Sequence, residues 1–273
     1  MKIGIVGLGS IGQRHMRNLL EMGETDLLGC DTRIGEPGFS CAPIQGVNNL
    51  GMLWAWKPEA VLICTPPDSH AALARAAIQQ KIHTFIEKPV ATNIADADAL
   101  RWEARMNGVQ VAVGYQLRWQ LNGIARGADL AWECAQDMRA WPSQYQKDVL
   151  SEFSHEIDAA VFKRGPVEAV AARKLWQRWE LKLRHLDGVS EISIQPETDG
   201  EYIRRCYDRN GKVWEFDQAR NDQAYKDELV AFLGACHGGE WDDRLCTGAQ
   251  AAHVVRIIAA AKTAANDCCV VTL

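Results

Sequence analysis

A glycine-rich turn near the N-terminus has the residue types and spacing needed to bind a dinucleotide. The apolar run Ile3–Val6 leads into Gly7-Leu8-Gly9-Ser10-Ile11-Gly12, and a helical pattern starts at the end of this turn. Gly7 permits a tight turn, Gly9 lets a pyrophosphate approach the backbone, and Gly12 lets the helix pack closely on the strand. The helix N-terminus offers N–H groups and a positive dipole end to phosphate oxygens. The spacing therefore predicts a bound nicotinamide or flavin nucleotide.

An acidic residue at the expected distance supports this interpretation and bears on the choice of cofactor. Asp31 falls 19 residues after Gly12 and ends a second strand-like run. A carboxylate there accepts hydrogen bonds from the adenosine ribose hydroxyls and repels a 2′-phosphate. Arg33 stands two residues on, and its guanidinium matches the geometry of a phosphate. The position of Asp31 favours NAD, and NADP stays open because of Arg33.

Composition narrows the class of protein. The 273 residues are 47% hydrophobic and 24% charged, with a net charge of −5. This balance argues against binding to nucleic acid or to an anionic membrane. We find no run long enough to span a membrane, no signal peptide and no metal-ligand spacing. The nine cysteines are odd in number and form no C-x-x-C pair, which predicts reduced thiols and a cytoplasmic location.

The pattern of elements predicts two different architectures along the chain. Over residues 1–118, strands and helices alternate as in a doubly wound parallel sheet, the Rossmann arrangement. Residues 119–245 predict an α+β domain on a mostly antiparallel open sheet, beginning with a helix over 118–127. Asn210-Gly211 is a hairpin signal within it. A final helix in 246–273 is expected to pack back toward the first domain.

Four further motifs give the chain a resemblance to a known family. They are Gly12-Gln13-Arg14-His15, Cys64-Thr65-Pro66-Pro67-Asp68-Ser69-His70, Ile86-Glu87-Lys88-Pro89 and Ser154-His155-Glu156-Ile157-Asp158. In this order they resemble the Gfo/Idh/MocA oxidoreductases, the family of glucose–fructose oxidoreductase and inositol 2-dehydrogenase. The Glu-Lys-Pro motif is the most diagnostic of them. The resemblance implies a Rossmann domain and a second domain whose open sheet packs against another subunit, so we expect a homodimer or homotetramer.

The resemblance also assigns roles to individual residues. It places Lys88 and His155 in proton transfer, since an ammonium or imidazole group can exchange a proton with a substrate hydroxyl. Members of the family carry an aspartate four residues before this histidine, but here Ser151 stands in that place. Glu152 is the nearest carboxylate, and either it takes over the role or the polar network is weaker. The predicted catalytic residues are Lys88, His155, Glu152 and Asp158, and the predicted substrate contacts are Tyr115 and Arg118. The predicted cofactor contacts are Gly7, Gly9, Ser10, Ile11, Gly12, Asp31, Arg33, Thr65, Pro66, His70, Glu87 and Lys88.

Three functions are compatible with these residues. The first is a dehydrogenase that moves a hydride between NAD(P) and a secondary alcohol or ketone of a sugar, sugar nucleotide or cyclitol, in surface-polysaccharide sugar biosynthesis. The second is a nucleotide-binding sensor or partner protein with weakened catalysis, which the serine at position 151 motivates. The third is a C=C or C=N reductase similar to biliverdin reductase. Fold alone does not decide among them, because function depends on the site.

Overall fold

The structure is a computed structural model of the whole chain, and it describes residues 1–136, 138–139, 148–176, 178–196, 198, 202–216 and 221–273. The chain forms two compact units. The first comprises Met1–Tyr115 and Asp222–Ala252, and the second comprises Gln116–Asn221 and His253–Leu273. Each unit contains its own seven-stranded sheet.

The first unit is a doubly wound sheet whose strands run in the order β13-β6-β5-β4-β1-β2-β3. The strands are β1 (Ile3–Val6), β2 (Leu27–Cys30), β3 (Gln45–Val47), β4 (Ala60–Ile63), β5 (His83–Glu87), β6 (Val111–Gly114) and β13 (Cys246–Thr247). All neighbours pair in parallel except β13, which runs antiparallel to β6. The central strands β1, β2, β4 and β6 are buried along their whole length, since helices cover both faces of such a sheet.

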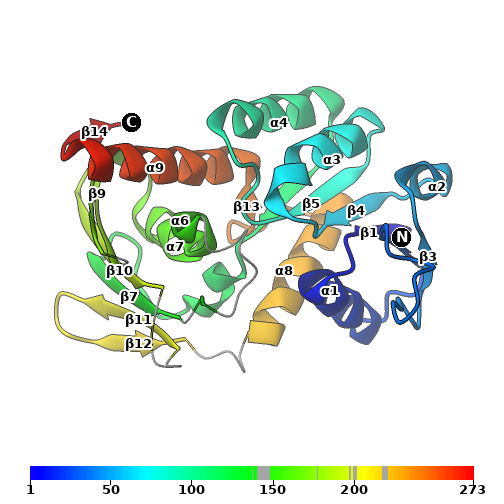
Figure 1. The fold of residues 1–273 in the computed structure, drawn as a ribbon, viewed down its shortest axis with the longest axis horizontal. Coiled ribbons are helices and arrows are strands. Elements are labelled where there is room, and N and C mark those ends of the chain that lie inside the picture. Colours follow the sequence, from blue (N-terminus) through cyan, green and yellow to red (C-terminus); the bar gives the residue numbers. More distant parts are fainter. Residues whose placement is uncertain (137, 140–147, 177, 197, 199–201, 217–220) are drawn as a thin grey trace. The chain divides into compact units, whose positions relative to one another are not determined.

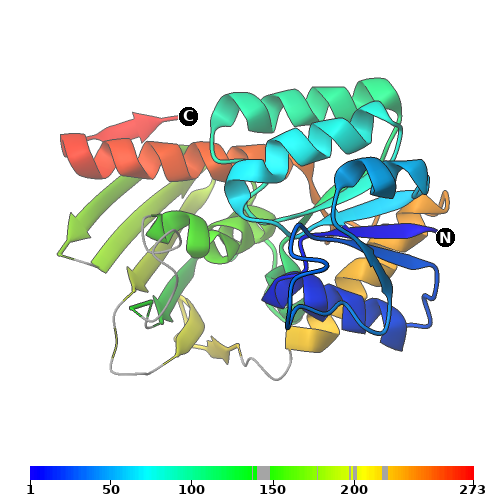
Figure 2. The same ribbon diagram turned by 45° about the vertical axis from the view of Figure 1, so that its right-hand side comes forward.

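Helices cover this sheet on two sides. They are α1 (Ser10–Glu21), α2 (Leu50–Ala55), α3 (Pro67–Gln79), α4 (Ile94–Asn107) and α8 (Asn221–Cys236). Helices α3 and α4 lie side by side on one face, and α1 and α8 lie on the other (Figures 1 and 2). The ends of α4 follow from its sequence: Asn93 caps the first turn by accepting a hydrogen bond from the Asp96 N–H, and Gly108 ends the helix with a φ of 68°.

The second unit is built on a mostly antiparallel sheet of order β12-β11-β7-β10-β9-β8-β14. The strands are β7 (Leu130–Ala135), β8 (Val167–Leu175), β9 (Arg178–His185), β10 (Gly188–Gln195), β11 (Ile203–Asp208), β12 (Val213–Glu215) and β14 (Val270–Thr272). Only the β7–β10 pair is parallel among those described. The predicted fold class, a parallel Rossmann sheet with a second antiparallel sheet, is confirmed.

The two faces of this second sheet differ in chemistry. Along β9, the side chains of Trp179, Leu181 and Leu183 are buried and alternate with exposed or half-exposed charged residues. Trp179 therefore lies on the face that the helices cover, and not on the open face. The helical elements of this unit are η1 (Gln116–Gln120), α6 (Val149–Glu152), α7 (Ser154–Arg164) and α9 (Gly248–Asp267). Figure 1 shows α7 and the C-terminal part of α9 on the same side of the sheet.

Several elements differ from the sequence-based expectations. In place of a helix over 118–127, the chain forms the short 3-10 helix η1 and then turns, because Gly123 and Gly127 adopt positive φ angles of 86° and 78°. The short strands β3 and β13 and the helix α2 were not anticipated. Helix α8, which falls within the predicted range 119–245, groups with the first unit, where the Glu228 carboxylate accepts a hydrogen bond from the Tyr115 N–H at 2.9 Å. From His253 onward, α9 groups with the second sheet, where its His253 ring accepts a hydrogen bond from the Val167 N–H.

Candidate cofactor and active site

The glycine turn between β1 and α1 leaves space at one position and none at two others. A Cβ atom on Gly12 would lie 1.9 Å from the Gly7 carbonyl oxygen, and one on Gly7 would lie 2.8 Å from Thr65. Gly7 also has a φ of 86°. A Cβ on Gly9, by contrast, would meet nothing within 4 Å. The protein itself therefore requires Gly7 and Gly12, whereas the free space beside Gly9 and the N–H groups of α1 at Ser10 and Ile11 fit a pyrophosphate.

Asp31, the residue that follows β2, is held by several hydrogen bonds. Its carboxylate accepts from the Leu8 N–H at 2.8 Å and from the Arg33 guanidinium at 2.9 and 2.8 Å. The bonds from Arg33 hold the pKa of Asp31 at about 2, although burial opposes this shift. Asp31 is therefore ionised across the neutral range. The Arg33 guanidinium also lies over the Phe39 ring, 4.3 Å from its centroid. A 2′-phosphate would thus meet a fixed carboxylate and a guanidinium already paired with it.

The turn after β4 is joined to the turn after β5 by a buried histidine. His70, in the first part of α3, is 1% exposed. Its Nδ1 lies 2.7 Å from the Pro89 carbonyl oxygen and its Nε2 lies 2.7 Å from the Thr65 carbonyl oxygen. The Ser69 hydroxyl lies 2.8 Å from the Pro66 carbonyl oxygen and holds the same turn. Sequence motifs far apart in the chain thus meet at the carboxyl ends of the adjacent strands β4 and β5.

Glu87 ends β5 and binds a histidine from α1. The His15 Nε2 lies 2.6 Å from one Glu87 carboxylate oxygen, and the Lys88 backbone N–H donates to the other oxygen at 3.2 Å. Both His15 and Glu87 are buried. The Glu87 carboxylate therefore fixes the backbone at Lys88, whose side chain is half-buried. Glu87 thus supports the backbone beside Lys88, and the predicted contact of Glu87 with the cofactor stays a prediction.

Helix α8 adds further residues to the cluster around His15 and Glu87, and none of them was predicted from the sequence. The Tyr225 ring packs edge-on against His15, with centroids 5.4 Å apart, and the Arg14 guanidinium lies over the Tyr225 ring, 5.1 Å from its centroid. Burial, and then the charge of Glu87, raises the pKa of Tyr225. Tyr225 is separated from His15 by most of the chain, so no local pattern could have pointed to their contact.

In the second unit, helix α7 brings buried acidic residues into contact with arginines. The Asp158 carboxylate accepts two hydrogen bonds from the Arg118 guanidinium of η1, at 2.7 and 2.6 Å. Neither side chain is exposed. Glu156 forms a second ion pair, in which its Oε1 lies 2.6 Å from the Arg204 Nε of β11. These pairs join α7 to η1 and to the sheet. Roles for Arg118 in substrate binding and for Asp158 in catalysis stay predictions.

The start of α7 holds the remaining predicted catalytic residues. His155 is buried on α7, and Glu152 is half-buried at the end of α6. Asp148 was overlooked in the sequence: it caps α6, and its Oδ2 accepts from the Ser151 hydroxyl at 2.7 Å and from the Lys262 ammonium of α9 at 2.8 Å. A carboxylate is thus bound to the side chain at position 151, although residue 151 itself is a serine.

The predicted site residues therefore fall into two groups. The first unit holds the predicted cofactor residues together with Lys88, and Tyr115 lies buried just after its strand β6. The second unit holds Arg118, Glu152, His155 and Asp158. Joint action of Lys88 and His155 stays a prediction. Among the residues that the structure describes, no three histidine, cysteine, aspartate or glutamate side chains gather as a metal site would require. None of the described helices combines the length and the apolar character needed to cross a membrane.

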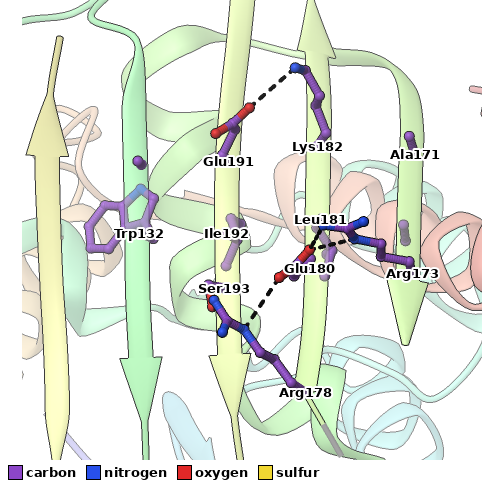
Figure 3. Close-up of a pocket in the computed structure, with 12 residues that line it drawn as sticks. Trp132, Ala171, Arg173, Arg178, Glu180, Leu181, Lys182, Glu191, Ile192 and Ser193 are labelled. Carbon is purple, nitrogen blue, oxygen red and sulfur yellow. Dashed lines mark hydrogen bonds and ion pairs between the residues drawn. The ribbon is translucent and has the colours of Figure 1, made fainter. Parts of the chain in front are cut away.

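The open face of the second sheet contains a hollow of about 500 Å³ (Figure 3). Charged side chains pair along it: Lys182 of β9 lies 3.2 Å from Glu191 of β10, and Glu180 of β9 pairs with Arg173 of β8 at 2.5 Å and with Arg178 of its own strand at 3.4 Å. Ile192 and Leu181 lie between these pairs, and the small side chain of Ala171 lies beside them on β8. None of the predicted catalytic residues lines this hollow, so the hollow is distinct from the candidate site.

The strand order and the glycine turn define a dinucleotide-binding unit of the Rossmann class. Comparison with known families agrees: residues 1–115 match the Gfo/Idh/MocA family, described as an oxidoreductase family with an NAD-binding Rossmann fold. Residues 1–115 thus carry the features of this family, and the first unit is an NAD-binding unit. The family and the cofactor class predicted from the sequence are confirmed.

Relatives with known names match less than half of the chain. Myo-inositol 2-dehydrogenase from Thermotoga maritima is 30% identical over 132 residues, which are 45% of this chain and 38% of that protein. UDP-N-acetylglucosamine 3-dehydrogenase from Acidithiobacillus ferrooxidans is 29% identical over 118 residues, 42% of this chain and 37% of that protein. In both cases the match spans less than two fifths of the relative's length.

Solved structures resemble the fold over the full chain. A probable dehydrogenase from Thermotoga maritima has a TM-score of 0.85 at 20% identity, covering 100% of this chain and 98% of its own. Scyllo-inositol dehydrogenase from Lactobacillus casei, solved with NAD(H) and scyllo-inositol, has a TM-score of 0.83 at 15% identity, with 100% and 98% coverage. At these identities the likeness establishes the fold of the chain.

Proposed function

We propose that this protein is an NAD-dependent dehydrogenase that moves a hydride between the nicotinamide and a secondary alcohol or ketone of a sugar, sugar nucleotide or cyclitol. The observation that carries the proposal is the position of Lys88. It follows β5 directly, at the sheet edge where the glycine turn and Asp31 also lie, and Glu87 fixes its backbone. Ligands of open α/β sheets bind at this edge.

The chemistry assigned to the chain's own residues is acid–base catalysis. Bound NAD supplies the hydride acceptor. In the oxidation direction, the Lys88 ammonium hydrogen-bonds the substrate hydroxyl oxygen and stabilises negative charge as it develops there. His155 receives the hydroxyl proton, and the C–H bond electrons leave with the hydride, so that a C=O bond forms. Glu152 or Asp158 sets the charge state of the pair. In the reverse direction His155 returns the proton.

The cyclitol and sugar substrates are proposed because relatives that match part of the chain carry such names. A screen that follows NADH absorbance would test them with myo-inositol, scyllo-inositol, UDP-N-acetylglucosamine and free aldoses, each with NAD and with NADP. We expect turnover with one of these classes and a loss in the Lys88→Met variant. Tight NAD binding without turnover of any of them would favour the sensor, and turnover of a linear tetrapyrrole would favour the reductase.

The proposal also includes a role in surface-polysaccharide sugar biosynthesis and a cytoplasmic location. The odd number of cysteines supports the cytoplasmic location, because it fits reduced thiols.

We further propose that the open face of the second sheet joins copies of this chain into a homodimer or homotetramer. Small side chains such as Ala131, and charged side chains already paired with each other such as Lys182 and Glu191, line the hollow on that face and let a second sheet approach it. Light scattering should give a multiple of the 30.3 kDa chain mass. Ala131→Arg, which adds a bulky charge to the face, should lower that mass. A wild-type mass of one chain would overturn this assembly.

A further inference from the structure

His70 stands between two groups that can only accept hydrogen bonds. Its two ring nitrogens each lie 2.7 Å from a backbone carbonyl oxygen, that of Pro89 on one side and that of Thr65 on the other. A neutral imidazole carries one N–H and one lone pair, whereas the imidazolium carries two N–H groups. Only the protonated ring satisfies both carbonyl groups. A neutral ring turns a lone pair toward one carbonyl oxygen at hydrogen-bonding distance, which is repulsive.

The surroundings of His70 oppose protonation in the free protein. Burial is the largest influence on its pKa and lowers it, and the Lys88 charge lowers it further. The two carbonyl contacts and the Glu87 carboxylate raise it, but the net direction is below the ordinary value of 6.5. The neighbouring Cys64 thiol adds no charge, because burial raises its pKa well above the usual range. At neutral pH the free protein therefore holds His70 mostly neutral, with one of its two contacts unsatisfied.

The two contacts connect the turns that flank the expected cofactor. Thr65 lies in the turn after β4, and its side chain occupies the space that a Cβ atom on Gly7 would need, so Thr65 lies against the glycine turn. Pro89 directly follows Lys88 in the turn after β5. A His70 ring that donates to both carbonyl groups thus fixes the Thr65 turn and the Lys88 turn relative to each other. The pyrophosphate of NAD is an anion, and an anion near a histidine favours its protonated form.

We propose that His70 is a positioning residue that takes up a proton when NAD binds and thereby locks the Thr65 turn to the Lys88–Pro89 turn. The proton comes from solvent, and no other bond forms or breaks. The proposal rests on NAD binding at the carboxyl ends of the strands, as in the proposed function. It goes further by coupling the cofactor to the placement of Lys88.

Isothermal titration calorimetry with NAD at pH 7 measures the number of protons that the protein takes up on binding. The titration is repeated in buffers of different ionisation enthalpy, because the measured heat then depends on that number. We expect net uptake by the wild type, and an NAD Kd that rises as pH increases, by at most about tenfold per unit for one linked proton. His70→Asn places its amide near the Nδ1 position and His70→Gln places its amide near the Nε2 position, so each keeps one contact and has no titrating group. Both variants should bind NAD more weakly at pH 6 and lose the uptake.

His83→Gln is the matched control. His83 lies at the opposite end of β5 and its ring accepts a hydrogen bond from the Gln110 N–H. Burial lowers the pKa of His83 too. This variant should keep the proton uptake of the wild type. Equal uptake in the wild type and the His70 variants would overturn the proposal, whereas absence of NAD binding in every form would instead overturn the proposed function.

A second measurement observes the His70 ring directly. In ¹⁵N spectra of labelled histidine rings, the His70 signal is identified by its loss in His70→Asn. At pH 7 we expect this ring to carry one N–H in the free protein and two N–H groups when NAD is bound. A ring that stays neutral with NAD bound would overturn the proposal.

Discussion

The Arg118 guanidinium and the Asp158 carboxylate form a two-bonded ion pair in which both side chains are fully buried. The pair joins η1 to α7, the helix that carries His155. Arg118 also lies over the Phe162 ring at 4.8 Å. Each charge is thus matched by the other inside the second unit. The pair is an internal support of the segment that holds the predicted catalytic histidine.

Removing one partner of this pair should destabilise the second unit strongly. Asp158→Asn or Arg118→Met leaves an uncompensated buried charge, and such losses cost about 3–5 kcal/mol. Urea denaturation followed by tryptophan fluorescence would measure the change. The double variant Arg118→Met/Asp158→Leu should lose less than the sum of the two single variants. A single-variant cost below about 1 kcal/mol, typical of an exposed pair, would contradict the buried arrangement.

The glycine turn gives a prediction that separates binding from folding. Gly9→Val places a side chain in free space, so we expect NAD binding to fall by at least tenfold while stability falls by about 1 kcal/mol or less. Gly12→Ala, in contrast, would put its Cβ 1.9 Å from the Gly7 carbonyl oxygen and should destabilise the fold. Fluorescence quenching by NADH and thermal unfolding measure the two effects. Unchanged NAD affinity in Gly9→Val would show that the pyrophosphate lies elsewhere.

Cofactor preference should depend on the Asp31–Arg33 pair. We expect the wild type to prefer NAD, because the ionised Asp31 carboxylate repels a 2′-phosphate. Asp31→Ala frees Arg33 to bind that phosphate and should shift the ratio of NADP to NAD affinity upward by about one to two orders of magnitude, roughly 1.4–2.8 kcal/mol. Arg33→Ala should keep NAD binding and weaken NADP. Tighter binding of NADP than NAD by the wild type would show that Arg33 dominates.

The sequence was most informative where function depends on neighbours in the chain. The spacing of Gly7, Gly9 and Gly12 and the distance to Asp31 led to the cofactor class, because the turn and its helix are local structures. The Glu-Lys-Pro motif, centred on Lys88, identified the family for the same reason.

Contacts between distant segments could not be predicted in this way. His15 binds Glu87, 72 positions away, and no local pattern indicates this contact. Glu228 reaches Tyr115 across 113 positions. A single sequence records which residues are present, but pairing of this kind depends on how sheets and helices pack. Asp148 is a further example, because its Oδ2 atom contacts both the nearby Ser151 hydroxyl and the distant Lys262 ammonium of α9.

Buried histidines predict a loss of stability in mild acid. Burial lowers the pKa of both His185 and His253 below the ordinary value of 6.5. The unfolded chain therefore binds these protons first, and the free energy of unfolding falls as pH decreases below about 6.5, by about 1.4 kcal/mol for each unit of pKa difference per group. His253 is the clearer case, since its Nε2 must stay unprotonated to accept from the Val167 N–H. Urea denaturation at pH 7.5, 6.5 and 5.5 should show this slope, and His253→Gln should flatten it. A stability that is constant over this range would contradict neutral, buried histidines.

The strongest test of the proposed mechanism is the combined removal of Lys88 and His155. Lys88→Met keeps the length of the side chain and deletes its charge and its donor, so NAD binding should persist while the hydride step slows by about two to four orders of magnitude. His155→Ala should show a similar loss, and Glu152→Gln a smaller one if this carboxylate only adjusts the charge of the pair. Because the two groups act on one proton, the double variant should be scarcely slower than either single variant. Stopped-flow measurement of NADH formation on the identified substrate separates the hydride step from product release. Full turnover by Lys88→Met would show that the chemistry does not pass through this pair, and the sensor or reductase function would then explain the fold better.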